Sequence, residues 1–497
     1  MSSRQQSLGL ARLVDSVGGE DGTPRYRRVR DALTTLIETG EMRGGDMLPS
    51  SRVLADGLGL SRNTVNRAYR ELVAEGFVEA IDRVGYVVNS GLGSSSGDVV
   101  DWVADPALPP LDWKGRLDGL QVDSEDVTKP ADWRSYPYPF VVGPGPESFP
   151  TGAWTRAMRT ALRKEHRGPS LHNLVDRDDP LLVEHIRKTI LPPRGIAADR
   201  SEILVTLGSQ HGIHLIAEAL LGPGSRVGVE EPGYPDARDT FVRQGAQTVP
   251  IPVDDQGINV PGRMRGLDML FVTPGRQFPT NVTMSIGRRR RILSEAARNG
   301  VVIVEDDYES EYCYSHQPPP ALKALDSTTG VVYVGSFSKF LAPGLRLGFV
   351  VSDARLIDCL RRLRHNMLRH PPGIIQRTTA LMIEAGDYGR VVRRHRRVLK
   401  SKWRTLTDSL SELFPWAVRP TDGGMSVWVE GPPELNAADL AVRARSRGVV
   451  IERGDPCFLS DPRPTNFFQL GFAAIEFDAI RPGIERLATL INEEASR

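Results

Sequence analysis

The chain has 497 residues, 40% hydrophobic and 25% charged, a composition typical of globular proteins. This length predicts two or three domains. Lys+Arg (63) and Asp+Glu (62) leave a formal net charge of +1, so the overall charge indicates neither a nucleic acid nor a membrane as partner, and only local clusters could do so.

The cysteine spacing and the first residues of the chain indicate the cellular compartment of the protein. Cys313, Cys359 and Cys457 are far apart and show no CxxC or Cys/His spacing, which argues against a zinc site or a disulfide framework. The first residues lack the apolar core of a signal peptide, and no apolar run approaches membrane-spanning length. The sequence therefore predicts a cytoplasmic protein with no metal site and no membrane partner.

Residues 24–89 predict a compact module of three helices and a hairpin. Gly40 can stop the first helix, Ser50 and Ser51 can start a second, and Ser61 can cap a third. The first helix has apolar residues at steps of three and four, namely Tyr26, Val29, Leu33, Leu36 and Ile37. The second helix carries Val53, Leu54 and Leu58. Strand-like runs at 76–81 and 85–88 predict a wing around Asp82-Arg83-Val84.

The third helix has two different sides, because each residue advances about 100° around a helix. One side is apolar, with Val65, Ala68, Tyr69 and Leu72. The other side carries Arg62, Asn63, Asn66, Arg67 and Arg70, residue types that bond phosphates and the edges of guanine and adenine in the major groove. A solvated helix face is the structural alternative. The candidate DNA-binding residues are Arg52, Ser61, Arg62, Asn63, Thr64, Asn66 and Arg67.

The motifs Leu-Pro-Ser-Ser-Arg, Ser-Arg-Asn-Thr-Val and Ala-Glu-Gly-Phe occur in this order, and the module resembles the GntR type of winged helix-turn-helix. The wing tip departs from that family, which usually has a Gly-rich turn there. Ten Arg against nine Asp+Glu within 24–89 give a balance of only +1. We therefore expect modest DNA affinity per module, and a dimer or a longer site for tight binding. Residues 90–134, rich in Gly, Ser, Asp and Pro, predict a linker.

From residue 135 to 497, alternating strand and helix patterns predict a mostly parallel sheet with helical crossovers. A strand at 203–206 leads through Gly208-Ser209-Gln210 into a helix, and free N–H groups at a helix start favour a phosphate. Tyr234, after Pro-Gly, could stack on an aromatic ring. Residues from about 399 to 497 predict a smaller α/β lobe that closes over the cleft.

The central stretch of this region is Ser336-Phe337-Ser338-Lys339, followed by Arg346. A lysine that follows a buried strand can be desolvated enough to attack a carbonyl, and a cofactor aldehyde is the obvious partner. The two serines and Arg346 suit a phosphate. The pattern predicts a pyridoxal phosphate pocket.

A second strand, Val301–Val304, supports this prediction, because Glu305-Asp306-Asp307-Tyr308 is expected to follow at its end, where α/β sheets place ligands. Asp306 is the candidate that keeps the cofactor's ring nitrogen protonated, and Tyr308 could bond its phenolic oxygen. Lys339 follows Asp306 by 33 residues (339 − 306), and this spacing with the Ser-x-Ser-Lys…Arg-x-Gly pattern resembles fold type I aminotransferases.

A winged helix, a linker and such a domain in one chain resemble the MocR/GabR group of bacterial transcriptional regulators. The resemblance implies Lys339 as the Schiff-base lysine, Asp306 at the ring nitrogen, Tyr308 at the phenolic oxygen and Tyr234 stacking on the ring. It implies that Ser209, Gln210, Ser336, Ser338 and Arg346 hold the phosphate. It further implies a domain-swapped, head-to-tail homodimer and a bipartite site on double-stranded operator DNA.

Three departures from the related enzymes bear on function. Phe278-Pro279-Thr280-Asn281 stands where aminotransferases carry Asn-Pro-x-Gly, so the asparagine that aids transamination is missing. Arg276 falls in a stretch where related regulators often carry His. Gln469 stands where an Arg should grip the substrate carboxylate. Either the effector lacks an ordinary α-carboxylate or another cation, such as Arg453 or Arg276, binds it.

The leading hypothesis is a pyridoxal phosphate-dependent regulator that senses an amine or amino-acid-like effector through external aldimine formation, with its aminotransferase-like domain used as a sensor. The alternatives are a working aminotransferase and a regulator that senses pyridoxal phosphate itself. A basic stretch, residues 361–404 with 13 Arg+Lys, predicts a solvated face or dimer contact, with a second DNA-contacting surface as the alternative.

Overall fold

The computed structural model describes most of the chain: residues 23–82, 84–90, 111–117, 129–143, 145, 148–173, 177–260, 262–314, 319–328, 330–337, 339, 341–414, 416, 418 and 423–495. These residues form two compact units, within 1–121 and 122–497. No helix in the described ranges is long and apolar enough to cross a bilayer. Most of the predicted linker lies outside these ranges, as do Arg83 at the predicted wing tip and Ser338.

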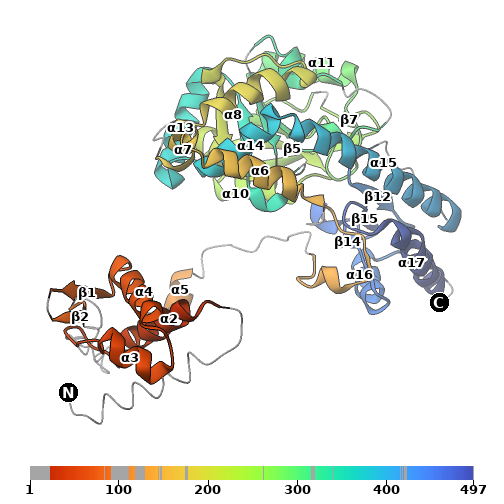
Figure 1. The fold of residues 1–497 in the computed structure, drawn as a ribbon. Helices are drawn as coiled ribbons and strands as arrows, with labels where there is room; N and C mark the ends of the chain where they lie inside the picture. Colours follow the sequence, from red (N-terminus) through yellow and green to blue (C-terminus); the bar gives the residue numbers. More distant parts are fainter. Residues whose placement is uncertain are drawn as a thin grey trace. The chain divides into compact units, whose positions relative to one another are not determined.

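The first unit is the predicted winged helix (Figure 1). Its elements are α2 (Arg25–Glu38), α3 (Ser51–Leu58), α4 (Arg62–Ala74), β1 (Val78–Ile81), β2 (Gly85–Val88) and the short α5 (Trp113–Leu117). The Ser50 hydroxyl accepts a hydrogen bond from the Val53 N–H, and Ser61 accepts one from Thr64, so both predicted serines cap helices. The apolar sides of α2 and α4 meet in one core beneath the antiparallel β1–β2 hairpin. Val53 is 56% exposed, because α3 buries Leu54 and Ala55 instead.

The second unit is built on an eight-stranded sheet with the order β4-β11-β10-β9-β8-β5-β6-β7. The strands are β4 (Ile203–Thr206), β5 (Arg226–Glu231), β6 (Gln247–Asp254), β7 (Gly257–Ile258), β8 (Met269–Val272), β9 (Val302–Asp307), β10 (Val331–Ser336) and β11 (Gly348–Val351). Strands β8, β9 and β10 are parallel neighbours, while β11 runs antiparallel to β10 and β4, and β7 to β6. The sheet is mostly parallel, as the sequence predicts.

Helices cover both faces of this sheet (Figure 1). One face packs on α9 (Gly208–Leu220), α10 (Pro235–Arg243) and α13 (Ala354–Leu368). The other packs on α6 (Thr151–Ala161), α7 (Arg167–Leu171), α8 (Pro180–His185), α11 (Ile286–Asn299), α12 (Leu322–Leu325) and α14 (Gly373–Glu384). The strands are apolar on both faces, which is what a parallel sheet covered on both sides requires.

A long helix, α15 (Asp387–Leu413), leads from this sheet to the small lobe (Figure 1). The lobe holds a sheet of β12 (Ser426–Glu430), β15 (Phe467–Gly471) and β14 (Glu452–Arg453), with α16 (Ala437–Ser446) and α17 (Ile480–Ala495). Its strand β13 (Val449–Val450) pairs in parallel with β3 (Tyr138–Pro139), far upstream in the chain. The lobe therefore includes residues near 138 besides the predicted 399–497.

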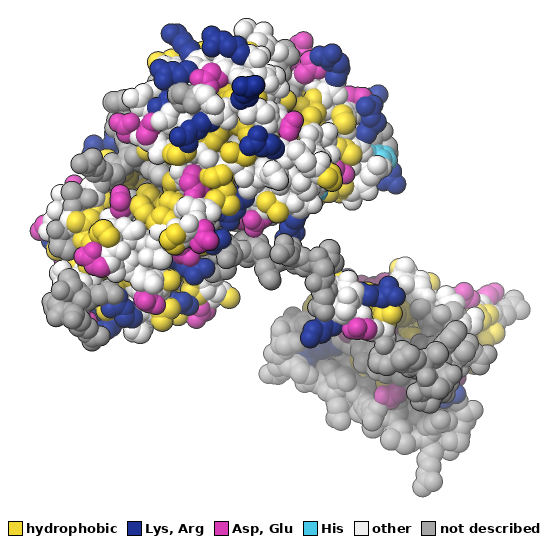
Figure 2. Space-filling view, turned by 180° about the vertical axis from the view of Figure 1, so that it is seen from behind, with side chains coloured by type: hydrophobic (Ala, Val, Ile, Leu, Met, Phe, Trp, Pro, Cys, Tyr) yellow, Lys and Arg dark blue, Asp and Glu magenta, His cyan; other side chains and the backbone are white. Residues whose placement is uncertain are grey.

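The basic stretch at 361–404 is not one surface. Arg361 and Arg364 form ion pairs with Asp178 at 2.9 and 2.5 Å, and Arg377 pairs with Asp179 at 2.7 Å. Arg364 is fully buried. On the face of the second unit drawn in Figure 2, cationic and anionic side chains are interspersed. Several cations of this stretch therefore hold α13 and α14 to the loop that precedes α8.

Candidate functional site

The exposed side of α4 is the candidate DNA interface of the first unit. Arg62, Asn63 and Arg67 are exposed, whereas Thr64 and Asn66 are half-buried. Arg67 places its guanidinium over the Tyr26 ring, 3.8 Å from the centroid, and lies 3.9 Å from a Glu71 oxygen. The Arg62 Nε donates to the Ser51 hydroxyl at 3.4 Å. Arg52, on α3, and Ser61 are also exposed. The helix thus presents cations and amides from one side while its apolar side is in the core.

The three carboxylates after Val304 lie on β9 itself, which corrects the prediction that the strand stops at Val304. Successive side chains of a strand point to opposite faces. Val304 is in the core shared with α9, so Asp306 points to the α9 face, and Glu305 and Asp307 point to the opposite face. The strand pleat therefore separates one acid from the other two.

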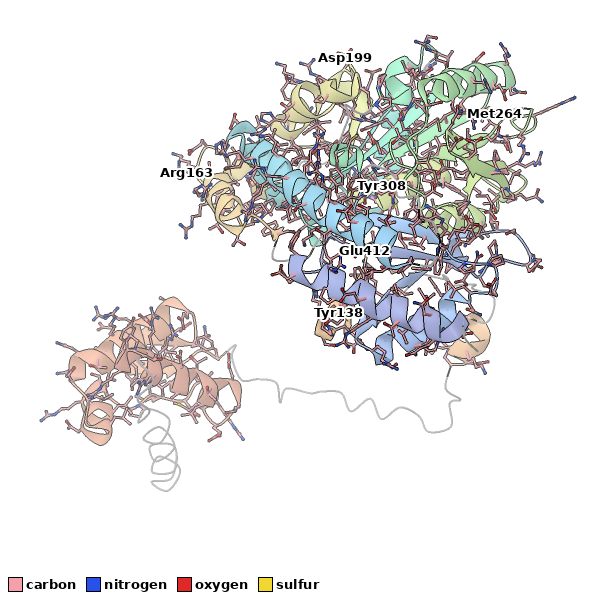
Figure 3. All side chains as sticks on the ribbon, turned by 90° about the vertical axis from the view of Figure 1, so that its right-hand side faces the viewer. Tyr138, Arg163, Asp199, Met264, Tyr308 and Glu412 are labelled. Atoms are coloured by element: carbon pink, nitrogen blue, oxygen red, sulfur yellow. The ribbon has the colours of Figure 1, made fainter. Side chains whose placement is uncertain are left out.

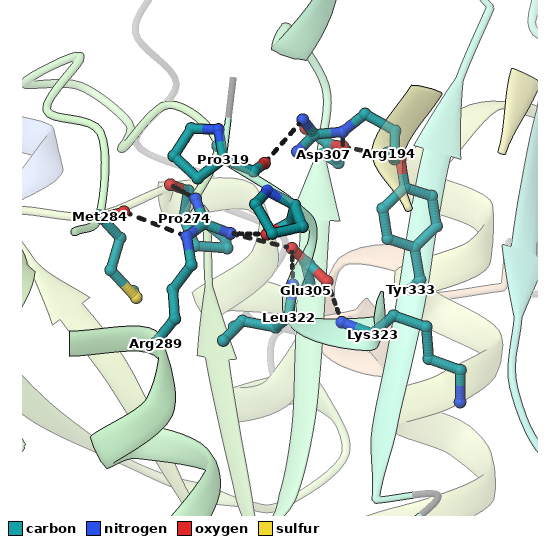
Figure 4. Close-up of polar contacts among 12 residues, drawn as sticks. Arg194, Pro274, Met284, Arg289, Glu305, Asp307, Pro319, Leu322, Lys323 and Tyr333 are labelled. Carbon is teal, nitrogen blue, oxygen red and sulfur yellow. Dashed lines mark hydrogen bonds and ion pairs between the residues drawn. The ribbon is translucent and has the colours of Figure 1, made fainter. Parts of the chain in front are cut away.

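The two acids on the opposite face are held by buried arginines (Figure 4). Arg194 Nε donates to Asp307 at 2.6 Å, and the Tyr333 hydroxyl donates to the same carboxylate at 2.7 Å. Arg289 lies 3.7 Å from Glu305, which also accepts the backbone N–H groups of Leu322 and Lys323. These partners allow the charged side chains of Glu305 and Asp307 to be buried. They also hold β9 in place on either side of Asp306.

Asp306 is buried, and its Oδ1 has no hydrogen-bond partner among the described residues. Burial raises the pKa of Asp306 to about 7; the Asp307 carboxylate adds to this rise, and the Lys339 ammonium opposes it. A buried carboxylate with an open oxygen suits a cationic N–H group, such as a protonated pyridine nitrogen.

Lys339 follows the end of β10, as the sequence predicts, and is half-buried; Ser336 is the last residue of that strand. The Lys339 Nζ lies 5.7 Å from the centroid of the Tyr308 ring. Tyr308 lies near the middle of the second unit in the view of Figure 3, between the large sheet and the small lobe. The Phe278 ring packs edge-on against both Tyr234 and Tyr308, with centroids 5.3 and 6.4 Å apart. The structure thus brings three predicted site residues, Lys339, Tyr308 and Tyr234, to one region around Phe278.

The start of α9 and Arg346 form the end of this region where the sequence predicts a phosphate. The α9 N-terminus has no side-chain cap, and the Arg346 Nη2 donates to the Leu207 carbonyl at 3.4 Å. Gly208 has φ +79°, and a Cβ there would lie 3.2 Å from Nη2, so the cradle requires glycine. Ser209 is half-buried beside it. The Gln210 amide instead donates to α10, at Thr240 and the Asp236 carbonyl, so only its backbone is left for a phosphate.

The opposite side of the region is formed by the turn at 276–281 and the small lobe. Arg276 is 3% exposed; its Nη atoms reach the carbonyls of Asn281 and Tyr312, and its Nε has no partner among the described residues. The Asn281 amide donates to the Ser426 carbonyl at 2.9 Å, and the Gln469 amide donates to the Ser426 hydroxyl at 2.7 Å. Hydrogen bonds through Asn281 and Ser426 therefore link Arg276 to Gln469.

Arg453 does not share this position. It follows Glu452 in β14, and Glu452 pairs in register with Gln469, so the pleat directs Arg453 to the other face of the small sheet. There its Nε lies 3.4 Å from Asp455, and its side chain is 41% exposed. Of the two cations predicted as alternatives to the missing arginine, the structure brings only Arg276 to Gln469.

Two buried acids of the region were missed by the sequence analysis. Burial raises the pKa of Glu309, while the charges of Lys339 and Arg276 and a backbone N–H oppose the rise. Burial raises the pKa of Glu230 to about 7 against hydrogen bonds from Thr273 and Gln277. Glu309 follows Tyr308 directly and could have been inferred from the same motif, whereas Glu230 lies on a different strand.

The fold and the site together define an aminotransferase-type domain joined to a DNA-binding winged helix. Residues 147–487 match the family described as aminotransferase class I and II, and residues 25–88 match the bacterial regulatory proteins of the gntR family. The chain is 38% identical to the HTH-type transcriptional regulator TauR of Rhodobacter capsulatus, across 95% of this chain and 97% of that protein. It is 30% identical to the probable rhizopine catabolism regulatory protein MocR of Rhizobium meliloti, across 93% of each.

Solved aminotransferases share the second unit. Kynurenine aminotransferase of Pyrococcus horikoshii matches with a TM-score of 0.67 and 26% identity, over 80% of this chain and 99% of that one. The α-aminoadipate aminotransferase LysN of Thermus thermophilus, complexed with N-(5'-phosphopyridoxyl)-L-leucine, matches with a TM-score of 0.66 and 29% identity, over 72% of this chain and 92% of that one. The chain belongs to the MocR/GabR group of transcriptional regulators, which carry a GntR-type module ahead of an aminotransferase-like domain.

Proposed function

We propose that this regulator binds pyridoxal 5'-phosphate at Lys339 and uses it to sense an amine or amino-acid-like effector. The observation that carries the proposal is the arrangement around Asp306. Its buried carboxylate oxygen lacks a partner among the described residues, on the sheet face that also carries the uncapped start of α9. A protonated ring nitrogen would pair with this carboxylate oxygen, and a phosphate would accept the free N–H groups at the start of α9.

When bound, the cofactor supplies an aldehyde that condenses with amines and a ring that withdraws electrons. Lys339 would hold the aldehyde, Asp306 would keep a proton on the ring nitrogen, and Tyr308 would donate to the phenolic oxygen. Tyr234, whose hydroxyl donates to Asp236 at 2.8 Å, would pack on the ring. The phosphate would be held by the α9 backbone at Ser209 and Gln210, by Ser336 and Ser338, and by Arg346.

The effector would compete with Lys339 for the cofactor through its own amine. Arg276, rather than Arg453, is the cation available to an anionic group on the effector. Its Nε has no partner among the described residues, and it reaches Gln469 through Asn281 and Ser426. An effector can shift the domain only if it binds two of its states unequally. The Asn281–Ser426 bond, which joins the large sheet's loop to the small lobe, is a contact that such a shift would strain.

The partners follow from the winged helix. A module whose exposed helix side carries only a few cations favours a dimer on a bipartite operator, and we propose the head-to-tail, domain-swapped homodimer of the group. A regulator of bacterial genes that binds operator DNA would work in the cytoplasm.

The experiment is an absorbance spectrum of the purified full chain with pyridoxal phosphate. We expect a visible band in the wild type and in a Lys164→Ala control, whose side chain is exposed, and none in Lys339→Ala. Gel shifts with operator DNA, cofactor and amines then test sensing. If neither cofactor nor amines change DNA binding or its footprint, the sensing proposal is wrong. Steady turnover of an amine with a keto acid would select an aminotransferase, and a response to the cofactor alone would select a cofactor sensor.

A further inference from the structure

Lys129 is the first described residue of the second unit, and it falls in the predicted linker from the winged helix. Its ammonium donates to the Val142 carbonyl and lies 3.7 Å from the Glu452 carboxylate. The Glu452 side chain is 2% exposed, and both of its oxygens accept the Val142 N–H at 3.3 Å. The end of the linker is therefore fastened to strand β14 of the small lobe through one lysine.

The Glu452 carboxylate of this contact is also within electrostatic reach of Lys339. Burial raises the pKa of Glu452, and the charges that oppose the rise include both Lys129 and Lys339. Two lysine ammonium groups, one from the linker and one from the end of β10, therefore act on a single buried carboxylate. Phe278, two residues after Arg276, packs against Tyr308, and the Tyr308 ring centroid lies 5.7 Å from the Lys339 Nζ, so the turn that carries Arg276 borders the region of Lys339.

Gln469 separates Lys129 from Arg276. In the small sheet Glu452 pairs in register with Gln469, so both side chains lie on one face. On its other side Gln469 donates to Ser426, which accepts from Asn281, whose carbonyl accepts from Arg276 at 3.5 Å. A neutral amide thus occupies the middle of a row that has a guanidinium at one end and an ammonium at the other.

Lys129 has a donor to spare. An ammonium carries three N–H groups, and the described residues supply two acceptors, the Val142 carbonyl and the Glu452 carboxylate. The side chain is 35% exposed, so the remaining N–H can reach a ligand. From the opposite side Arg276 offers its Nε, for which the described part of the chain supplies no partner.

We propose, on the basis of the function proposed above, that Lys129 is a specificity-determining residue of the effector site. The effector is an amine that also carries a carboxylate or sulfonate group. Its amine lies at Lys339, and its anionic group lies over Gln469 between Arg276 and Lys129. Lys129, in the predicted linker, supplies part of the positive charge that Gln469 lacks. Binding of the effector therefore also fixes the end of the segment that leads to the winged helix.

The test compares amines that carry an acidic group with alkylamines that lack one. The full-length protein loaded with pyridoxal phosphate is titrated with γ-aminobutyrate and 2-aminoethanesulfonate, which are the acidic amines, and with the alkylamines n-butylamine and n-propylamine, and the visible band is followed. We expect Lys129→Met to weaken binding of the acidic amines by about 10- to 100-fold, the range for a hydrogen bond to a charged group, with little effect on the alkylamines. Lys129→Arg should restore most of the preference.

Two control variants isolate the role of Lys129. Arg453→Met removes a cation from the opposite face of the small sheet, and Lys114→Met removes an exposed lysine of α5 in the predicted linker; neither should change the preference. Tryptic cleavage between residues 91 and 128 gives a second readout. The acidic amines should slow this cleavage in the wild type and not in Lys129→Met.

The outcomes separate the two proposals. If no amine changes the band of the wild type, the proposed sensing function fails. If the wild type responds to amines but binds the acidic amines no more tightly than the alkylamines, or if Lys129→Met keeps the wild-type preference, the role of Lys129 is refuted while the sensing function stands.

Discussion

Replacement of Asp306 by Asn should change how the stability of the cofactor-free protein depends on pH. The carboxylate has an ordinary pKa of 3.8 and a pKa of about 7 in the fold, mainly because it is buried. The folded state therefore binds a proton between these pH values that the unfolded state has released. By linkage, this site makes stability fall as pH rises from about 4 to about 7.

The magnitude follows from the difference of 7 − 3.8, or about 3 pKa units. At 1.36 kcal/mol per unit, the site destabilises the cofactor-free fold by about 4 kcal/mol at pH 8 relative to pH 4. Asn keeps the shape of the side chain but cannot ionise. We expect Asp306→Asn to be more stable than the wild type at pH 8 by up to this amount, and to lose the advantage as the pH falls from about 7 to about 4.

The assay is urea unfolding of the cofactor-free protein, followed by tryptophan fluorescence at pH 5 and pH 8. Asp408→Asn, an exposed site on α15, serves as the matched control and should follow the wild type at both pH values. Glu311, whose pKa burial raises to about 7, remains in every variant and cancels in the comparison. Equal unfolding midpoints for Asp306→Asn and the wild type at pH 8 would refute the burial argument. The same variant should bind the cofactor more weakly, because Asn cannot form an ion pair with a protonated ring nitrogen.

Three further predictions follow from local geometry. Arg194→Met should cost about 3 to 5 kcal/mol in urea unfolding because it leaves the buried Asp307 carboxylate without its cation, and adding Asp307→Asn should recover much of the loss; equal losses in the single and double variants would contradict the pairing. Ser61→Ala should lower the thermal stability of the winged helix by about 1 kcal/mol through loss of the α4 cap, and an unchanged melting curve would rule out that role. Gly208→Ala should cost about 1 to 2 kcal/mol and weaken cofactor binding, since its φ is +79° and the Cβ would approach Arg346; unchanged cofactor affinity would count against the cradle.

The sequence alone predicted the elements whose apolar residues recur at regular steps and pack into a hydrophobic core. The stripes of α2 and α4 are buried as predicted, because steps of three and four leave one side of a helix apolar in any context. The strand that ends near Lys339 was predictable for a similar reason: an apolar run without helical spacing packs between two layers of helices.

The length of β9 was not predictable from the sequence. Three consecutive carboxylates normally end a strand, since buried charges require partners. Here the partners are two arginines. Arg194 is remote from β9 in the chain and pairs with Asp307, and Arg289 lies on α11 and pairs with Glu305. Only the folded structure brings these charges together. The same limit applies to Lys129, which stands in a stretch with no regular pattern and reaches Glu452 more than 300 residues away. The strand pleat also decides that Arg276, and not Arg453, lies near Gln469. The sequence alone does not show this.

The position of Phe278 bears on whether such a domain senses or turns over its ligand. In the enzymes that the chain resembles, an asparagine stands before the proline of this turn, whereas here a phenylalanine ring packs between Tyr234 and Tyr308. A phenyl ring cannot donate a hydrogen bond, so of these two positions only Tyr308 is left to bond the cofactor's phenolic oxygen. Weaker stabilisation of the reacting ring should slow chemistry and lengthen the time that an effector stays bound, which suits a sensor. Phe278→Asn should then raise keto acid release from a bound amino acid about fivefold, the equivalent of one hydrogen bond worth about 1 kcal/mol, in a single-turnover assay. If release stays at the wild-type rate while the visible band is kept, the missing asparagine is not what limits turnover in this domain.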